Sequence, residues 1–155
     1  MRFFWVLLGL CFVCNSFAQD RSGIGMSWAE GSSSPDPVAN LGLRLEEAYG
    51  LYGMPRSVRA LRGPEAWQDD VIFSYEGFEL YWYKDRVWQV ATEEAFGIKS
   101  GDAQSAVLAV LGEPLNIIDG AYIYQLPGRP WPVRIRIGFD EKGLVKVIYI
   151  FRADY

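Results

Sequence analysis

The chain has 155 residues, with 15 lysines and arginines against 19 aspartates and glutamates, so its formal net charge at neutral pH is −4. An acidic chain without a run of basic residues is a poor nucleic-acid binder. The sequence also contains no histidine, which removes the usual general base near neutral pH and the commonest zinc ligand.

Residues 1–18 have the features of a secretory signal peptide. Arg2 gives the N-terminal region a positive charge, and residues 3–13 form an unbroken apolar run. Ser16 and Ala18 are small residues at the positions that signal peptidase recognises before its cleavage site. The apolar run is too short to cross a bilayer. We therefore predict cleavage between Ala18 and Gln19 and a periplasmic or secreted protein.

Both cysteines, Cys11 and Cys14, precede this cleavage site, so the mature chain is predicted to have neither a disulfide nor a thiol nucleophile. An alternative makes Cys14 a lipidated N-terminus that anchors the protein in the envelope. Val13 before it and Cys11 three residues earlier fit a lipoprotein signal poorly, so simple secretion is favoured. Membrane association is expected only if Cys14 is lipidated.

The segment 19–40 is rich in glycine, serine and proline, with Gly31-Ser32-Ser33-Ser34-Pro35 at its centre. Such a composition buries too little apolar surface to offset the entropy lost on ordering. We predict a flexible N-terminal arm over 19–40.

The stretch 100–114 is predicted to be a short helix, because residues typical of helix starts and helix ends flank it. Ser100 or Asp102 can cap its first turn, because a side-chain oxygen there accepts from free backbone N–H groups. Gly112 and Pro114 end it. The apolar residues at helical spacing form one stripe, which consists of Ala103, Val107, Val110 and Leu111.

An earlier stretch, 41–55, carries the same pattern. Its ending, Tyr52-Gly53-Met54-Pro55, repeats the ending Leu111-Gly112-Glu113-Pro114. Each helix is followed by strand-like runs, at 71–75, 78–83 and 87–90 in the first half and at 121–125, 133–139 and 144–147 in the second. We predict an α+β fold in which two units, 41–96 and 97–155, are tandem repeats of a helix plus a three- to four-stranded antiparallel meander, with sheets that lie side by side or join.

The run from Gly97-Ile98 through Leu111-Gly112-Glu113-Pro114 resembles the helix signature of the SmpA/OmlA (BamE-type) small outer-membrane lipoproteins. Two such units in tandem resemble the secreted β-lactamase-inhibitor-protein (BLIP-like) fold. The resemblance covers 41–151 and implies a helix-on-sheet fold, with a role in envelope assembly or in enzyme inhibition. Because the mature chain lacks cysteine, the disulfide-stapled loops of the inhibitor are absent.

Candidate catalytic groups are few, and we expect no enzyme, no cofactor and no metal site. The sequence has no phosphate-binding glycine loop and no nucleophile elbow. The acidic pairs Asp69-Asp70 and Glu93-Glu94 leave a carboxylate hydrolase as a weak third possibility. Neighbouring acids on a strand point to opposite faces, so we interpret these pairs as surface charges.

The candidate binding residues lie on the second face of the predicted sheet. Alternation along 78–83 places Tyr81 and Tyr83 opposite the apolar side, and alternation along 133–139 does the same for Arg134 and Arg136. Tyrosine and arginine are enriched at binding hot spots. We predict that these four side chains are exposed and bind another envelope or secreted protein, although an ordinary solvated sheet face explains the same pattern.

A different class of function uses the tryptophans. A small-molecule or glycan binder would gather Trp67, Trp82, Trp88 and Trp131 around a closed pocket, whereas a protein binder would present a broad face.

The predicted signal peptide, residues 1–18, can be tested directly. We expect the mature protein to begin at Gln19 and to carry no lipid, because the small residues at the predicted cleavage site fit signal peptidase. Intact-mass measurement of the exported protein checks this. A diacylglyceryl mass on a chain that starts at Cys14 would contradict it.

Overall fold

The computed structural model describes residues 36–64 and 70–154. Strands make up most of this part, and both helices are short. The predicted signal peptide and most of the predicted arm lie outside the described residues. The elements in chain order are α1 (Leu45–Tyr52), β1 (Ser57–Leu61), β2 (Asp70–Ser74), β3 (Phe78–Tyr83), β4 (Arg86–Thr92), β5 (Glu94–Ala95), β6 (Ile98–Lys99), α2 (Gln104–Leu111), β7 (Asn116–Ile118), β8 (Ala121–Leu126), β9 (Val133–Phe139) and β10 (Val145–Arg152).

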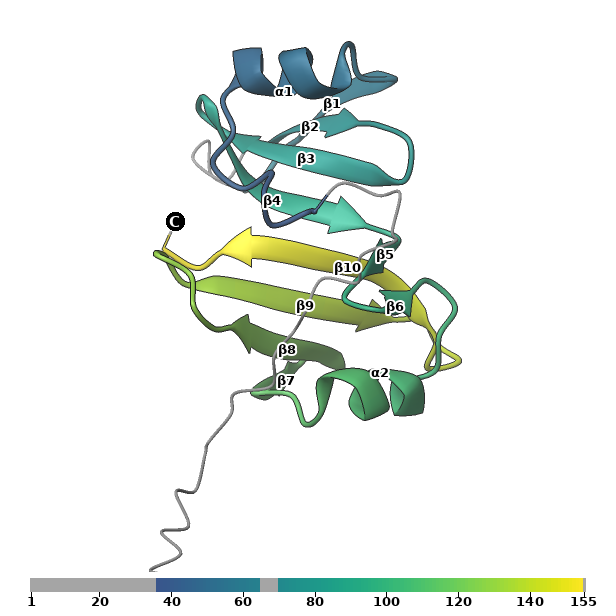
Figure 1. Ribbon diagram of the computed structural model, residues 1–155. Coiled ribbons are helices and arrows are strands. Elements are labelled where there is room, and N and C mark those ends of the chain that lie inside the picture. Colours follow the sequence, from purple (N-terminus) through teal and green to yellow (C-terminus); the bar gives the residue numbers. More distant parts are fainter. Residues whose placement is uncertain (1–35, 65–69, 155) are drawn as a thin grey trace, which may run out of the picture.

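Eight strands form one continuous antiparallel sheet in the order β1-β2-β3-β4-β10-β9-β8-β7. The first four strands follow the order of the chain, and the last four run in reverse, so β4 and β10 meet in the middle (Figure 1). Their pairing joins 148–151 to 89–92, with Ile148 opposite Thr92 and Ile150 opposite Val90. The remaining strands, β5 and β6, form a separate two-stranded hairpin.

The predicted α+β fold of two tandem helix-plus-meander repeats is therefore wrong. The protein has a β-rich fold whose main body is a single eight-stranded sheet, and each of the two helices within residues 36–64 and 70–154 has only eight residues. Local sequence signals located helices and strands but did not say how the strands combine. An unpaired β4 or β10 would expose a row of backbone N–H and C=O groups, and their mutual pairing removes both of these edges.

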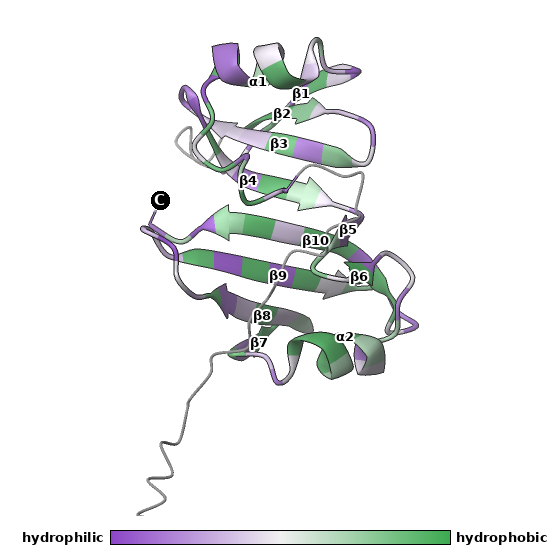
Figure 2. Cartoon of the chain, viewed as in Figure 1, coloured by the Kyte–Doolittle hydropathy of each residue, from purple (hydrophilic) through white to green (hydrophobic). Residues whose placement is uncertain are grey.

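One face of the sheet carries the main hydrophobic core. Along β9, three buried residues, Val133, Ile135 and Ile137, alternate with exposed Arg134 and Arg136 (Figure 2). Both helices bury side chains against this face, namely Ala48 from α1 and Val107 and Leu111 from α2. This face is the core face, and the opposite side is named the second face.

A bulge in β4 interrupts the alternation near the centre of the sheet. Tyr81 pairs with Gln89, whereas the next residue, Trp82, pairs with Val87, so Trp88 has no cross-strand partner of its own. The extra residue lets Val87 and Val90 both face the core while Trp88 packs on the second face.

The α2 prediction is confirmed in part. Val107 and Leu111 are buried, but Val110 is 47% exposed. The helix begins after Ala103 without a side-chain cap, since the Asp102 carboxylate instead accepts a hydrogen bond from the Lys99 backbone N–H. Gly112 ends the helix with a positive φ of 74°, as its position predicted.

The arm prediction is wrong for 36–40. Val38 and Asn40 are buried, and the Asp36 carboxylate accepts a hydrogen bond from the Val38 backbone N–H, which forms a tight turn. The Tyr52 hydroxyl at the end of α1 donates to the Asn40 amide oxygen. Asp36 and Tyr52 thus hold a segment whose composition alone indicated disorder.

Leu111 tests the contact between α2 and the sheet. Because this side chain is 3% exposed, Leu111→Ala should lower the free energy of unfolding by about 2–5 kcal/mol through lost burial and a new cavity. The matched control is Val110→Ala one residue earlier, which should cost within about 0.5 kcal/mol because Val110 is half exposed. Denaturant melts measure both, and equal costs would show that the helix packs through another face.

Candidate functional site

The candidate site is the second face of the sheet, where strand pairing aligns side chains in two rows. The first row runs Arg59, Ile72, Tyr81, Gln89, Phe151, Arg134 and Gln125. The second runs Ser57, Ser74, Glu79, Ala91, Tyr149, Arg136, Ile123 and Asn116. Each row crosses the β4–β10 pair, so the second face is continuous from one end of the sheet to the other.

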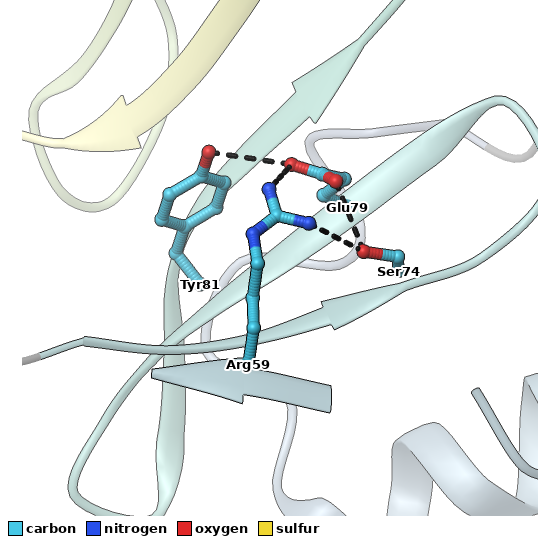
Figure 3. A network of polar contacts seen from close by, with 4 residues as sticks. All are labelled: Arg59, Ser74, Glu79 and Tyr81. Atoms are coloured by element: carbon cyan, nitrogen blue, oxygen red, sulfur yellow. Dashed lines mark hydrogen bonds and ion pairs between the residues drawn. The ribbon is translucent and has the colours of Figure 1, made fainter. Parts of the chain in front are cut away.

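On strands β1 to β3 the second face holds a polar network (Figure 3). Arg59 Nη2 lies 2.7 Å from Glu79 Oε2, and Arg59 Nη1 donates to Ser74 Oγ at 2.9 Å. Ser74 Oγ in turn donates to Glu79 Oε1 at 2.9 Å, and the Tyr81 hydroxyl points at Glu79 Oε2 at 3.4 Å. The carboxylate of Glu79 therefore has one cation and two hydroxyls around it.

The network shifts the pKa values of its members. Burial by itself raises the pKa of the Glu79 carboxyl, but the hydrogen bonds from Arg59 and Ser74 outweigh burial and hold this pKa below its ordinary value. The hydrogen bond to Glu79 raises the pKa of the Arg59 guanidinium. Burial, followed by the nearby Tyr149 and Glu79, raises the pKa of Tyr81. Glu79 is thus ionised and Tyr81 neutral near pH 7.

On strands β4, β10, β9 and β8 the second face has a different character. Arg134 and Arg136 are exposed, and neither side chain makes a hydrogen bond or ion pair within the described part of the chain. Phe151 lies directly opposite Arg134, and Tyr149 lies directly opposite Arg136. The two rows carry no carboxylate on these four strands. This half of the second face therefore presents two uncompensated cations beside two half-buried aromatic rings.

The four predicted binding residues do not share one surface as expected. Arg134 and Arg136 are exposed side by side, but Tyr81 is only 7% exposed, so its predicted exposure is wrong. The Tyr81 ring packs with Ile72 and meets the Tyr149 ring edge-on, with 6.2 Å between the ring centroids. Alternation gave the correct face for Tyr81, but neighbouring strands cover it.

Tyr83 lies apart from the two rows. It pairs with Arg86 beyond the β4 bulge, at the end of β3, and is half buried. The Lys84 ammonium lies 5.1 Å from the centre of its ring. Tyr83 therefore stands at the end of its strand, away from Arg134 and Arg136.

Sequence reasoning missed several second-face residues, above all Arg59, Tyr149 and Phe151. Alternation along 78–83 puts Glu79 on the same side as Tyr81, but it did not single Glu79 out as part of a site. The alternation in β10 could have placed Tyr149 and Phe151 on one face. Their position opposite the arginines depends on the β9–β10 register. Arg59 lies in 57–61, which is not among the predicted strand-like runs, and all five residues of β1 are exposed in the structure.

The tryptophans considered for glycan binding do not gather around one pocket. Trp82 is buried on the core face against Phe73, at 5.1 Å between ring centroids, whereas Trp88 packs on the second face. The Trp88 indole donates to Asp70 Oδ1 at 2.9 Å. The Arg152 guanidinium lies 4.8 Å from the centre of the Trp131 ring. Trp67 lies outside the described residues.

The acidic pairs can be followed only in part. Glu93 and Glu94 are both exposed, Asp70 accepts the Trp88 hydrogen bond, and Asp69 lies outside the described residues. Across 36–64 and 70–154, no three His, Cys, Asp or Glu side chains come together as a group that could hold a metal ion. Over the same residues, no helix is both long and apolar enough to cross a membrane.

Comparison with known proteins supplies a fold relationship. No family model matches the sequence, and no curated protein does. A solved structure of an extracellular protein containing an SCP domain, from Bacillus anthracis str. Ames, matches with a TM-score of 0.51 and 9% sequence identity. The match covers 79% of this chain but 47% of that one, so the chain spans about half the length of its structural neighbour. At this identity the likeness shows a shared fold alone, and the resemblance to SmpA/OmlA and BLIP-like proteins stays a prediction.

The Glu79 network predicts a pH-dependent contribution to stability. Because folding lowers the pKa of Glu79, its contribution is fully present above the unfolded-state value of about 4.3 and is lost as the pH falls through the lower folded value. Glu79→Gln should therefore cost about 1 kcal/mol at neutral pH, since the site is partly exposed, and progressively less in acid. Denaturant melts across this pH range measure the difference, and a difference that does not change with pH would contradict the network.

Proposed function

We propose that this protein is a non-catalytic module that binds another protein through the second face of its sheet, over strands β8 to β10. The observation that carries this proposal is the pair Arg134 and Arg136, exposed and without a partner in the described chain, beside Tyr149 and Phe151. An ordinary solvated arginine gains little from its surroundings, but a pair flanked by aromatic rings offers both charge and apolar contact.

The residue types fit an interface. Arginine and tyrosine dominate binding hot spots, and aromatic side chains are enriched at interface cores. Tyr149 and Phe151 are half buried, so each residue keeps part of its surface accessible, and the Tyr149 side chain packs against the buried cluster of Ile72, Tyr81 and Ala91. A partner that covers this area would bury rigid aromatic surface at a small entropic cost.

We further propose that the protein acts outside the cytoplasm, in the periplasm or as a secreted protein. The signal-like leader supports this location, and the structural neighbour is itself described as extracellular. The partner is then another envelope or secreted protein, and envelope assembly and enzyme inhibition are the two settings that the sequence resemblance suggests.

Removal of the two arginines tests the proposal. The double variant Arg134→Ala with Arg136→Ala should weaken binding of the partner, isolated by affinity capture and then purified, by about 2 kcal/mol or more, because such anchors carry most of the binding free energy. Calorimetry with the purified partner measures this loss, and the thermal melt should stay nearly unchanged because both side chains are exposed.

Arg59→Ala is the matched control. It removes one positive charge from the same face of the sheet, but from an arginine that Glu79 already neutralises. Binding should therefore be nearly unaffected. Full binding by the double variant would remove the β8–β10 region from consideration.

A further inference from the structure

We propose, on the basis of the function proposed above, that the partner presents an extended acidic segment whose carboxylates bind Arg134 and Arg136. Three observations carry this inference. The chain completes a carboxylate site by itself elsewhere on the same face, the two rows carry no acid on β4, β10, β9 and β8, and the two arginines are two residues apart along β9.

The Glu79 network shows how this face binds a carboxylate. Arg59 supplies the cation, Ser74 and Tyr81 supply hydroxyls, and all three surround the Glu79 side chain. On the other half of the second face, Arg136 lies directly opposite Tyr149. Arg136 and Tyr149 thus correspond in type to Arg59 and Tyr81, but the two rows hold no carboxylate on these strands that corresponds to Glu79.

The two sets are neighbours. The Tyr149 ring meets the Tyr81 ring edge-on at 6.2 Å, and Tyr81 is the tyrosine that points at Glu79. A carboxylate bound at Arg136 would therefore lie on the same continuous face as Glu79, three strands away in the same row. The chain supplies one acid, and we infer that the partner supplies the other.

The distribution of charge supports this assignment. The chain has 19 acidic residues against 15 basic ones, yet the second-face rows on β4, β10, β9 and β8 carry two arginines and no acid. Gln89 and Gln125 stand in the Arg134 row and add neutral amide donors. An incoming carboxylate thus meets cations and hydrogen-bond donors without a like charge beside them in these rows.

The spacing defines the shape of the ligand. Arg134 and Arg136 are two residues apart on one strand, so their side chains emerge from the same face roughly 7 Å apart. An extended chain with an acid at every second residue has the same repeat. Bidentate pairing between a guanidinium and a carboxylate would then form twice along β9.

A protein segment fits better than a nucleic acid. Binding of a phosphate backbone depends on several cationic contacts, and the chain as a whole is negatively charged. Two arginines are enough to bind two carboxylates, but two cationic contacts bind a nucleic-acid phosphate backbone only weakly. An oligonucleotide is therefore included in the test as a competing ligand.

The sharpest variant leaves both arginines in place. Gln125 is exposed and lies directly opposite Arg134, so Gln125→Glu supplies a carboxylate within the chain with almost no change of size. This carboxylate should occupy Arg134 and lower the affinity for the acidic ligand at least about tenfold. Asn116→Asp is the matched control, because it makes the same amide-to-acid change on the same face, but opposite Ile123. It should bind almost as the wild type does.

The ligand is a synthetic peptide of alternating aspartate and serine, compared with the same peptide carrying asparagine for aspartate. With the full chain, calorimetry should show binding of the acidic peptide alone, weaker at high salt and weaker still for Gln125→Glu, while the thermal melts agree. No binding of the acidic peptide, or tighter binding of a single-stranded oligonucleotide, would overturn the proposal.

The purified partner separates this inference from the proposed function. If its binding requires Arg134 and Arg136 but is unchanged by Gln125→Glu and by salt, the protein-binding function stands and the acidic ligand is wrong. If the affinity for the purified partner is unchanged when Arg134 and Arg136 are replaced by alanine, both proposals are wrong.

Discussion

The pairing of β4 with β10 is the interaction on which the rest of this structure depends. It joins only 89–92 to 148–151, yet Val90, Ile148 and Ile150 at this contact are completely buried. The pairing satisfies backbone groups that would otherwise form two exposed edges. It also aligns the two rows of the second face, because each row passes from β3 through β4 and β10 to β9. The contact between Tyr81 and Tyr149 exists only because these strands meet.

The second face belongs to one continuous sheet, but its two halves differ in charge. In one half, Arg59 has a carboxylate within the chain, and the pair is partly shielded from water. In the other half, Arg134 and Arg136 are exposed to water when the protein is alone, so they cost the folded state little desolvation. A ligand that removes this water must return equivalent interactions. In the proposed complex, carboxylates would supply these interactions and a neutral surface would not.

The sequence predicted what depends on local periodicity. Alternation along β9 gave the exposed side of Arg134 and Arg136, and helical spacing gave the burial of Val107 and Leu111. Sequence-based prediction failed for features that depend on contacts between residues far apart in the chain. The α+β repeat fold was wrong because the merger of the strands into one sheet is a long-range event, and Tyr81 was placed on the surface because its cover comes from other strands. No local pattern pairs Arg136 with Tyr149.

The position of the arginines within the sheet also governs how strongly they can bind. β9 is paired on both sides, by β8 and β10, so the backbone at Arg134 and Arg136 is fixed before any ligand arrives. The outer strands β1 and β7 lack a second neighbour, and every residue in them is exposed. Ordering an arginine side chain costs up to about 2 kcal/mol, and that is the main conformational cost left at the β9 site.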